Sequence, residues 1–250
     1  MDHRAYWQGA AERFAEVLGE AAMDAPVPGC PGWEVADLAF HLGRVYDRFT
    51  QVAQDRLTAL EDVRLVPRVQ RPEEDRALPG WFRARADALD AALTDLSDDE
   101  PLWNFTTAPQ VAAWLPRRML HETTVHRYDL EQAAGSVTGI APDVARDGVD
   151  EFLTVLSGTV PGGVVDGVLE LRVEEVPDGP RWHVRLEPEG VRVVDVPRAG
   201  SDGGPSGLGA TLRGDAPTLL LTLWQRLPLS SVEVGGSKEA AVTFLRALAR

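Results

Sequence analysis

The sequence predicts a two-domain α+β protein, in which a helical bundle is followed by a small α+β domain with a mainly antiparallel sheet. Apolar residues recur every three or four positions in four long segments of the N-terminal part, as on amphipathic helices. A stretch rich in glycine and proline, 157–167, then breaks any helix. Alternating β-forming residues and turn residues follow it. The expected domains are residues 1–157 and 168–250.

The first domain is expected to hold four long helices joined by modest connections, which indicates an antiparallel bundle. A loop rich in proline and glycine, 26–33, separates the first two helices. Pro116 belongs in the first turn of the fourth helix, and Gly135 suits its C-terminal cap. The expected helices are 6–21, 35–52, 81–96 and 115–134, with a further helix at 142–156.

The second domain is expected to be a strand meander with helices on one face of the sheet. Pro-Asp-Gly-Pro and Pro-Glu-Gly supply turns between the first strands, and a glycine- and serine-rich loop is expected at 199–209. The expected strands are 169–176, 182–186, 191–196, 210–213 and 231–234, and the expected helices are 216–226 and 238–249.

Composition restricts the functions that this chain can perform. Its 250 residues are 44% hydrophobic, enough for a substantial core. The formal net charge of −14 repels nucleic-acid backbones and anionic lipid surfaces, so neither is an expected partner. The N-terminus lacks the apolar core of a signal peptide, and a cytoplasmic location is expected. The expected partners are small molecules instead. The protein itself is expected to be a monomer or a homodimer.

The single cysteine, Cys30, excludes an internal disulfide and any zinc site built from several cysteines. Cys30 lies in a loop that leads into a helix, where a thiolate can be stabilised. No partner base is identifiable, so a small apolar side chain filling a tight loop is the favoured interpretation.

The string His-Glu-Thr-Thr-Val-His, residues 121–126, is the most informative motif. Glu122 and His126 lie about 40° apart on one helix face, whereas His121 and His126 lie about 140° apart. Glu122 and His126 can therefore bind one metal ion together, unlike the zinc-protease motif, in which two histidines four apart are the ligands. Asp129 continues the same face, either orienting a ligand or lying on the helix surface.

His41 is the best third ligand, because it lies among core-facing residues of the second helix. Three protein ligands leave one zinc position open, as in a catalytic site. A hydrogen-bonded core histidine is the alternative for His41. Asp37, one turn before His41, either orients a ligand or lies on the helix surface, as for Asp129.

Three further residues have side chains of a type that can bind a ligand. Trp33 and Trp114 fit the core better than a binding platform. Arg226 ends a predicted helix, where its guanidinium could bind a substrate carboxylate through two hydrogen bonds or simply complement the helix dipole.

Two segments, Cys-Pro-Gly-Trp-Glu-Val-Ala-Asp-Leu-Ala-Phe-His-Leu-Gly (30–43) and Arg-Met-Leu-His-Glu-Thr-Thr-Val-His-Arg-Tyr-Asp (118–129), resemble the mycothiol-dependent maleylpyruvate isomerase family of actinobacteria. Residues 219–229, Leu-Leu-Leu-Thr-Leu-Trp-Gln-Arg-Leu-Pro-Leu, are similar to its C-terminal domain. The resemblance covers nearly the whole chain. It implies a DinB-like four-helix bundle that binds a divalent metal, followed by a sterol-carrier-like α+β domain.

The resemblance also implies roles for particular residues. The metal ligands of the family fall on His41, Glu122 and His126, the same three residues that helix geometry selects. Its catalytic arginine falls on Arg226. The chain departs from the family at Glu34, where relatives commonly have a Thr or Ser that caps the helix, so a weaker start of the second helix is expected.

Three functions are compatible with these features. The first is a metal-dependent, mycothiol-using isomerase or thiol S-transferase, with zinc the preferred ion, acting on a small electrophilic substrate that bears a carboxylate. Its metal would produce a thiolate nucleophile, and Arg226 would hold the carboxylate. The second is a metal-dependent hydrolase that activates water. The third is a non-catalytic protein that binds a small molecule.

Overall fold

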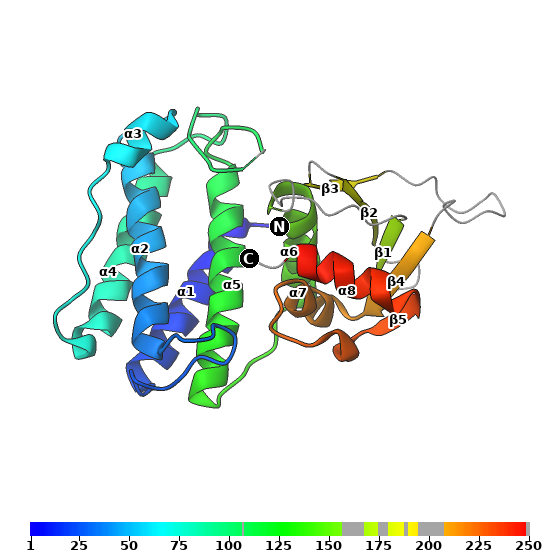
Figure 1. The fold of residues 1–250 in the computed structure, drawn as a ribbon. Coiled ribbons are helices and arrows are strands. Elements are labelled where there is room, and N and C mark those ends of the chain that lie inside the picture. The colour runs from blue at the N-terminus through cyan, green and yellow to red at the C-terminus, as the bar shows by residue number, and fades with distance from the viewer. Residues whose placement is uncertain (107, 157–167, 175–179, 188–189, 195–207, 249–250) are drawn as a thin grey trace. The chain divides into compact units, whose positions relative to one another are not determined.

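A computed structural model describes residues 1–250 except 107, 157–167, 175–179, 188–189, 195–207 and 249–250 (Figure 1). Its contacts divide the chain into two compact units, Met1–Thr138 and Gly139–Arg250. The expected α+β class, with a helical N-terminal part and a mainly antiparallel sheet, is confirmed. The domain limits 1–157 and 168–250 remain a prediction.

The N-terminal unit is helical. The four long helices predicted from the sequence are all present, and a short helix and one 3-10 turn lie between the second and the third of them. Its helices are α1 (His3–Glu20), α2 (Val35–Gln54), α3 (Leu60–Leu65), α4 (Leu78–Thr94) and α5 (Trp114–Ala134), with the 3-10 turn at Asp75–Ala77. Gly135 ends α5 with a φ of 70°, as its predicted capping role requires.

The start of α2, where a weaker cap was predicted at Glu34, is supported by Asp37. The Glu34 amide donates a hydrogen bond to the Asp37 carboxylate at 3.1 Å, which satisfies one backbone donor at the helix start. Arg71 holds the other Asp37 oxygen at 2.7 Å. Asp37 therefore stabilises the helix start rather than orienting a metal ligand.

Aromatic packing joins the long helices of this unit. Helix α1 packs on α5 and α4, and α2 packs on α4 and α5. The ring centroids of the buried Phe14 and Phe82 lie 4.6 Å apart. Nε1 of Trp7 donates a hydrogen bond to the buried Tyr46 hydroxyl at 3.0 Å. Each of these contacts connects two different helices, so together they set how the helices pack.

Gly43 permits a close approach of α2 and α4. A Cβ atom at this position would lie 2.1 Å from Cζ3 of Trp81. No real contact is that short, so the Trp81 ring occupies the space that any other residue at position 43 would need.

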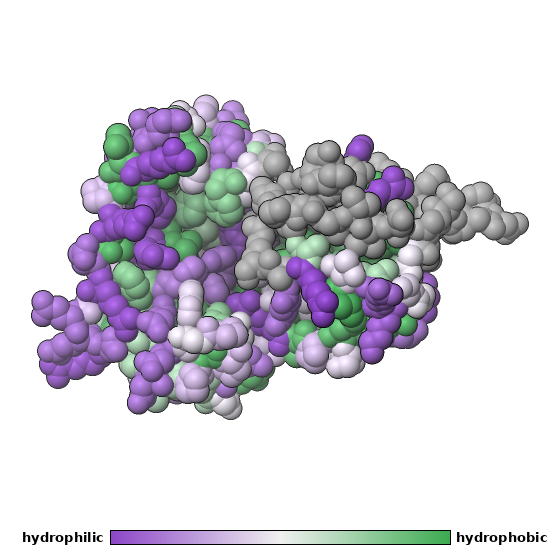
Figure 2. All heavy atoms as spheres, viewed as in Figure 1, coloured by the Kyte–Doolittle hydropathy of each residue, from purple (hydrophilic) through white to green (hydrophobic). Residues whose placement is uncertain are grey.

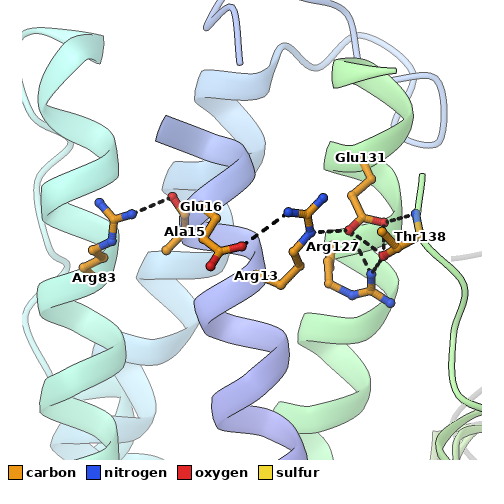
Figure 3. A network of polar contacts seen from close by, with 7 residues as sticks. All are labelled: Arg13, Ala15, Glu16, Arg83, Arg127, Glu131 and Thr138. Atoms are coloured by element: carbon orange, nitrogen blue, oxygen red, sulfur yellow. Dashed lines mark hydrogen bonds and ion pairs between the residues drawn. The ribbon is translucent and has the colours of Figure 1, made fainter. Parts of the chain in front are cut away.

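A buried carboxylate connects α1, α5 and the end of the unit (Figure 3). Glu131 is fully buried and accepts hydrogen bonds from Arg127 Nη1 at 2.9 Å and from the Thr138 amide at 2.8 Å. Arg13 of α1 reaches the same carboxylate at 3.2 Å. The charge of Glu131 is thus paired and hydrogen-bonded, as burial requires.

The C-terminal unit contains a five-stranded sheet with the order β3-β2-β1-β4-β5, in which only the β1–β4 pair is parallel. The strands are β1 (Val168–Val173), β2 (Arg181–Glu187), β3 (Gly190–Val193), β4 (Leu208–Gly214) and β5 (Glu233–Gly236). Its helices are α6 (Pro142–Glu151), continued by a π-helical turn at Phe152–Leu156, α7 (Ala216–Leu223) and α8 (Lys238–Ala247), with a 3-10 turn at Leu229–Ser231.

Helices α7 and α8 pack on strands β1 and β4. Cross-strand partners such as Leu171 and Leu212 are buried on one face of the sheet. The predicted helix 216–226 was too long, because α7 ends at Leu223 and Gln225 adopts a φ of 59° that no helix continues. The predicted linker 157–167 and most of the predicted loop 199–209 lie outside the described residues.

The visible face of the molecule is mostly hydrophilic over the N-terminal unit, with hydrophobic patches between (Figure 2). Among the described residues no helix combines the length and the hydropathy that crossing a membrane requires.

Candidate metal centre

Helix α5 places Glu122 and His126 on one face, one turn apart. Nε2 of His126 lies 3.5 Å from Oε1 of Glu122. The spacing of four residues in an unbroken helix is sufficient to bring these two side chains together.

His41 approaches the same carboxylate oxygen from α2. Its Nε2 lies 3.3 Å from Oε1 of Glu122, and its ring centroid lies 5.0 Å from that of His126. The ligand atoms of His41, Glu122 and His126 all lie within 4.8 Å of one another. The structure therefore brings together the three residues expected to bind metal.

The geometry of these three side chains fits a zinc ion. Ligand atoms about 2.0–2.1 Å from a tetrahedral zinc lie about 3.3 Å from each other. The two nitrogens lie 3.3 and 3.5 Å from Oε1 of Glu122, close to this value, and all three ligand atoms lie within 4.8 Å of one another. Two imidazoles and one carboxylate are donors that zinc prefers. The His41 and Glu122 side chains are 23% and 19% exposed, so a further ligand could reach the ion from solvent.

The second ring nitrogen of His126, Nδ1, contacts a buried carboxylate. Nδ1 of His126 lies 3.0 Å from Oδ2 of Asp129, whose side chain is fully buried. Because Nδ1 donates to this carboxylate, Nε2 is left to face His41 and Glu122. The sequence had left open whether Asp129 orients a ligand or lies on the surface, and the structure shows the contact that orients His126.

Cys30 lies next to this support. Its Sγ atom is 3.5 Å from Oδ2 of Asp129, and the loop that carries it precedes α2. Cys30, His126 and Asp129 form a second group of potential metal donors, on the Nδ1 side of the same imidazole. Sequence reasoning missed this position, because Cys30 and Asp129 are 99 residues apart.

Arg118 holds the other oxygen of Glu122. Its Nη2 donates to Oε2 at 3.0 Å, and the Arg118 side chain is 2% exposed. With Oε2 bound in this way, Oε1 is the oxygen that faces both histidines. Sequence reasoning missed Arg118, although it precedes Glu122 by four residues on the same helix and could have been found by this spacing.

The charges of the site stabilise each other. Burial by itself would raise the pKa of Glu122, but hydrogen bonds from His126 and His41 and the charge of Arg118 hold that pKa well below its ordinary value. Burial by itself would lower the pKa of His126, but hydrogen bonds to Asp129, Cys30 and Glu122 raise that pKa well above its ordinary value. A cation between the three ligands would take the place of the proton on His126.

Two tryptophans that were expected to lie in the core, and the candidate substrate-binding arginine, are placed as follows. Trp33 is half-buried, with its ring centroid 5.0 Å from that of His41, so it borders the site. Trp114 packs in the core against Phe49. Arg226 lies in the C-terminal unit, half-buried, where its Nη1 donates to the Trp224 carbonyl at 2.9 Å.

Two domain-family profiles match the chain. "Mycothiol maleylpyruvate isomerase N-terminal domain" matches residues 5–131, and "MDMPI C-terminal domain" matches residues 143–243. No curated protein matches the sequence.

The fold is similar to solved structures of a mycothiol-dependent maleylpyruvate isomerase. One crystal structure superposes with a TM-score of 0.61 at 13% identity, covering 94% of this chain and 92% of the other. A variant with one histidine replaced by alanine superposes with a TM-score of 0.59 at 13% identity, with the same coverage. At this identity the likeness concerns the fold alone.

Proposed function

Because the chain belongs to the mycothiol maleylpyruvate isomerase family of enzymes, we propose that it binds a divalent metal, preferably zinc, through His41, Glu122 and His126 and uses mycothiol as its thiol cofactor. The observation that carries this proposal is the convergence of one carboxylate oxygen and two imidazole nitrogens at 3.3 and 3.5 Å. A zinc ion held there would lower the pKa of a thiol in its open position, which supplies a thiolate at neutral pH.

The protein's own residues would prepare the site for this chemistry. Asp129 holds the proton on Nδ1 of His126, so that Nε2 presents its lone pair to the ion. Arg118 fixes Oε2 of Glu122 and leaves Oε1 as the ligand atom. Trp33 lies beside His41, with their ring centroids 5.0 Å apart, and borders the site.

The reaction proposed is isomerisation or thiol S-transfer on a small electrophilic substrate that bears a carboxylate. The thiolate would add to the electrophilic carbon, after which rotation and elimination give isomerisation, whereas retention of the sulfur gives transfer. Arg226 is proposed to bind the substrate carboxylate through its planar guanidinium. Isomerisation and transfer require the same residues, so these residues support both outcomes equally.

The first test is the metal content of the purified protein. We expect about one zinc ion per chain, lost in both His126→Ala and Glu122→Ala but retained in His3→Ala, a histidine outside the site. A wild type that stays metal-free after incubation with zinc would contradict the metal assignment.

The second test separates the thiol from the metal. Zinc-loaded protein is assayed with maleylpyruvate, with and without mycothiol. Activity that requires both components supports the proposal, whereas activity with zinc and no thiol would indicate hydrolysis or another water-based reaction. An Arg226→Ala variant is expected to keep its zinc and to show a higher KM.

A further inference from the structure

A groove on the N-terminal unit lies apart from the proposed metal ligands. It has a volume of about 340 Å³ and lies between α2 and residues 67–69 of the α3–α4 connection, drawn in cyan in Figure 1. This volume is in the range of about 300–1,000 Å³ that holds small organic ligands. None of the three proposed metal ligands lines the groove.

The wall of the groove is positively charged. Three arginines, Arg44, Arg48 and Arg68, line it, and within the described part of the chain none of them forms an ion pair with a carboxylate. The one acidic lining residue, Asp47, is already paired with Arg85 at 3.2 Å. Uncompensated positive charge is concentrated here in a protein whose net charge is −14.

Two of these arginines are set close together by the helix. Arg44 and Arg48 are four residues apart on α2, a spacing at which like charges repel and destabilise a helix. Arg48 is anchored by a hydrogen bond from Nη1 to the Val63 carbonyl, and the Arg44 guanidinium lies 5.9 Å from the Phe40 ring centroid. An anion in the groove would remove this repulsion, because guanidinium groups bind oxyanions through paired hydrogen bonds.

The rest of the lining is apolar. Phe49 is only 5% exposed, and Val45 and Val69 are half-buried along the groove. A ligand suited to this surface has an apolar body as well as an anionic group. A bare inorganic ion would leave the apolar wall in contact with water.

We propose that this groove is a binding site for a small carboxylate with an apolar body, in which Arg44 and Arg68 bind the carboxylate and Val45, Phe49 and Val69 contact the body. The site is separate from the metal centre and requires neither the ion nor the thiol.

The test uses benzoate as the probe, with benzamide as its uncharged counterpart of similar shape and inorganic phosphate as a bare anion. Binding to the full chain is followed by NMR of ¹⁵N-labelled protein, in both chelator-treated and zinc-loaded samples. We expect saturable shifts of the Val45 and Val69 amides with benzoate in both samples, and none with benzamide. Phosphate is expected to bind at least about tenfold more weakly than benzoate, because it makes no apolar contact.

The variants Arg44→Gln and Arg68→Gln are expected to weaken benzoate binding by about tenfold or more each. The matched control is Arg64→Gln, an exposed arginine on α3 outside the lining, which should bind benzoate like the wild type. Both test arginines are exposed, so none of the three variants should unfold at a lower temperature than the wild type. Arg44→Gln should unfold at the same or a slightly higher temperature, because it removes the repulsion between Arg44 and Arg48. Equal binding of benzamide, equal binding of phosphate, shifts that need zinc, or equal losses in the control would each overturn the proposal.

Discussion

Nδ1 of His126 donates a hydrogen bond to Oδ2 of the fully buried Asp129 at 3.0 Å, and this contact determines which nitrogen of the imidazole faces His41 and Glu122. The support is local, because both residues belong to α5 and are three positions apart. The contact also matters for α2, because it leaves Nε2 of His126 as the nitrogen that faces His41 and can bind an ion.

Asp129→Asn is expected to weaken zinc binding by about 10- to 100-fold, because the amide supports Nδ1–H of His126 less strongly and lowers the basicity of Nε2. The affinity is measured by competition with a chromogenic chelator. Asp87→Asn, on the exposed surface of α4, is the control and should leave the affinity unchanged. Equal affinities in wild type and Asp129→Asn would mean that Asp129 has no supporting role.

Cys30→Ser is expected to keep one zinc ion per chain, because the Cys30 thiol donates a hydrogen bond to Asp129 and a serine hydroxyl can do the same. Metal content and chelator competition check this outcome. Loss of zinc in Cys30→Ser, together with its retention in Glu122→Ala, would place the ion in the alternative donor group formed by Cys30, His126 and Asp129.

Glu131→Gln is expected to lower the free energy of unfolding by roughly 3–5 kcal/mol at neutral pH, because it removes the buried negative charge that pairs with Arg127. The measurement is urea unfolding followed by circular dichroism. Glu16→Gln, whose side chain is 55% exposed and pairs with the same Arg13, should change this free energy by less than about 1 kcal/mol.

The Glu131→Gln substitution is also expected to change how the free energy of unfolding depends on pH. Burial raises the pKa of Glu131, but hydrogen bonds from Thr138 and the charge of Arg127 bring that pKa below its ordinary value of 4.5. A carboxyl group with a depressed folded-state pKa stabilises the protein above pH 4.5, and this stability is lost as the pH falls through the folded-state pKa. The free energy of unfolding of the wild type should therefore fall more below pH 4.5 than that of Glu131→Gln. If this free energy fell equally with pH in both proteins, Glu131 would not contribute to the pH dependence of stability.

Gly43→Ala is expected to destabilise the N-terminal unit by about 1–3 kcal/mol, because the new Cβ atom would overlap the Trp81 ring. Gly9→Ala is the matched control, since no atom lies within 4 Å of a Cβ there, and it should stabilise α1 by roughly 0.5–1 kcal/mol. Opposite effects of the two substitutions in urea unfolding would confirm that packing against Trp81, and not helix propensity, requires the glycine.

Local spacing explains which parts of the site could be predicted. The Glu122–His126 pair follows from helical periodicity, and the end of α5 follows from Gly135. Arg118 obeys the same spacing, but only the structure shows that its guanidinium turns inward to Glu122. The short α3 was missed because six residues give too little periodicity to detect.

The sequence by itself determined the α+β class, the four long helices and the residue types able to bind an ion, because these depend on periodicity, turn chemistry and composition. Only the tertiary structure decided that His41 of α2 meets Glu122 of α5 at 3.3 Å, and that Cys30 reaches Asp129 across 99 residues. Contacts between distant segments depend on how the helices pack, and packing is set by side-chain shape, such as Trp81 against Gly43, which no local pattern encodes.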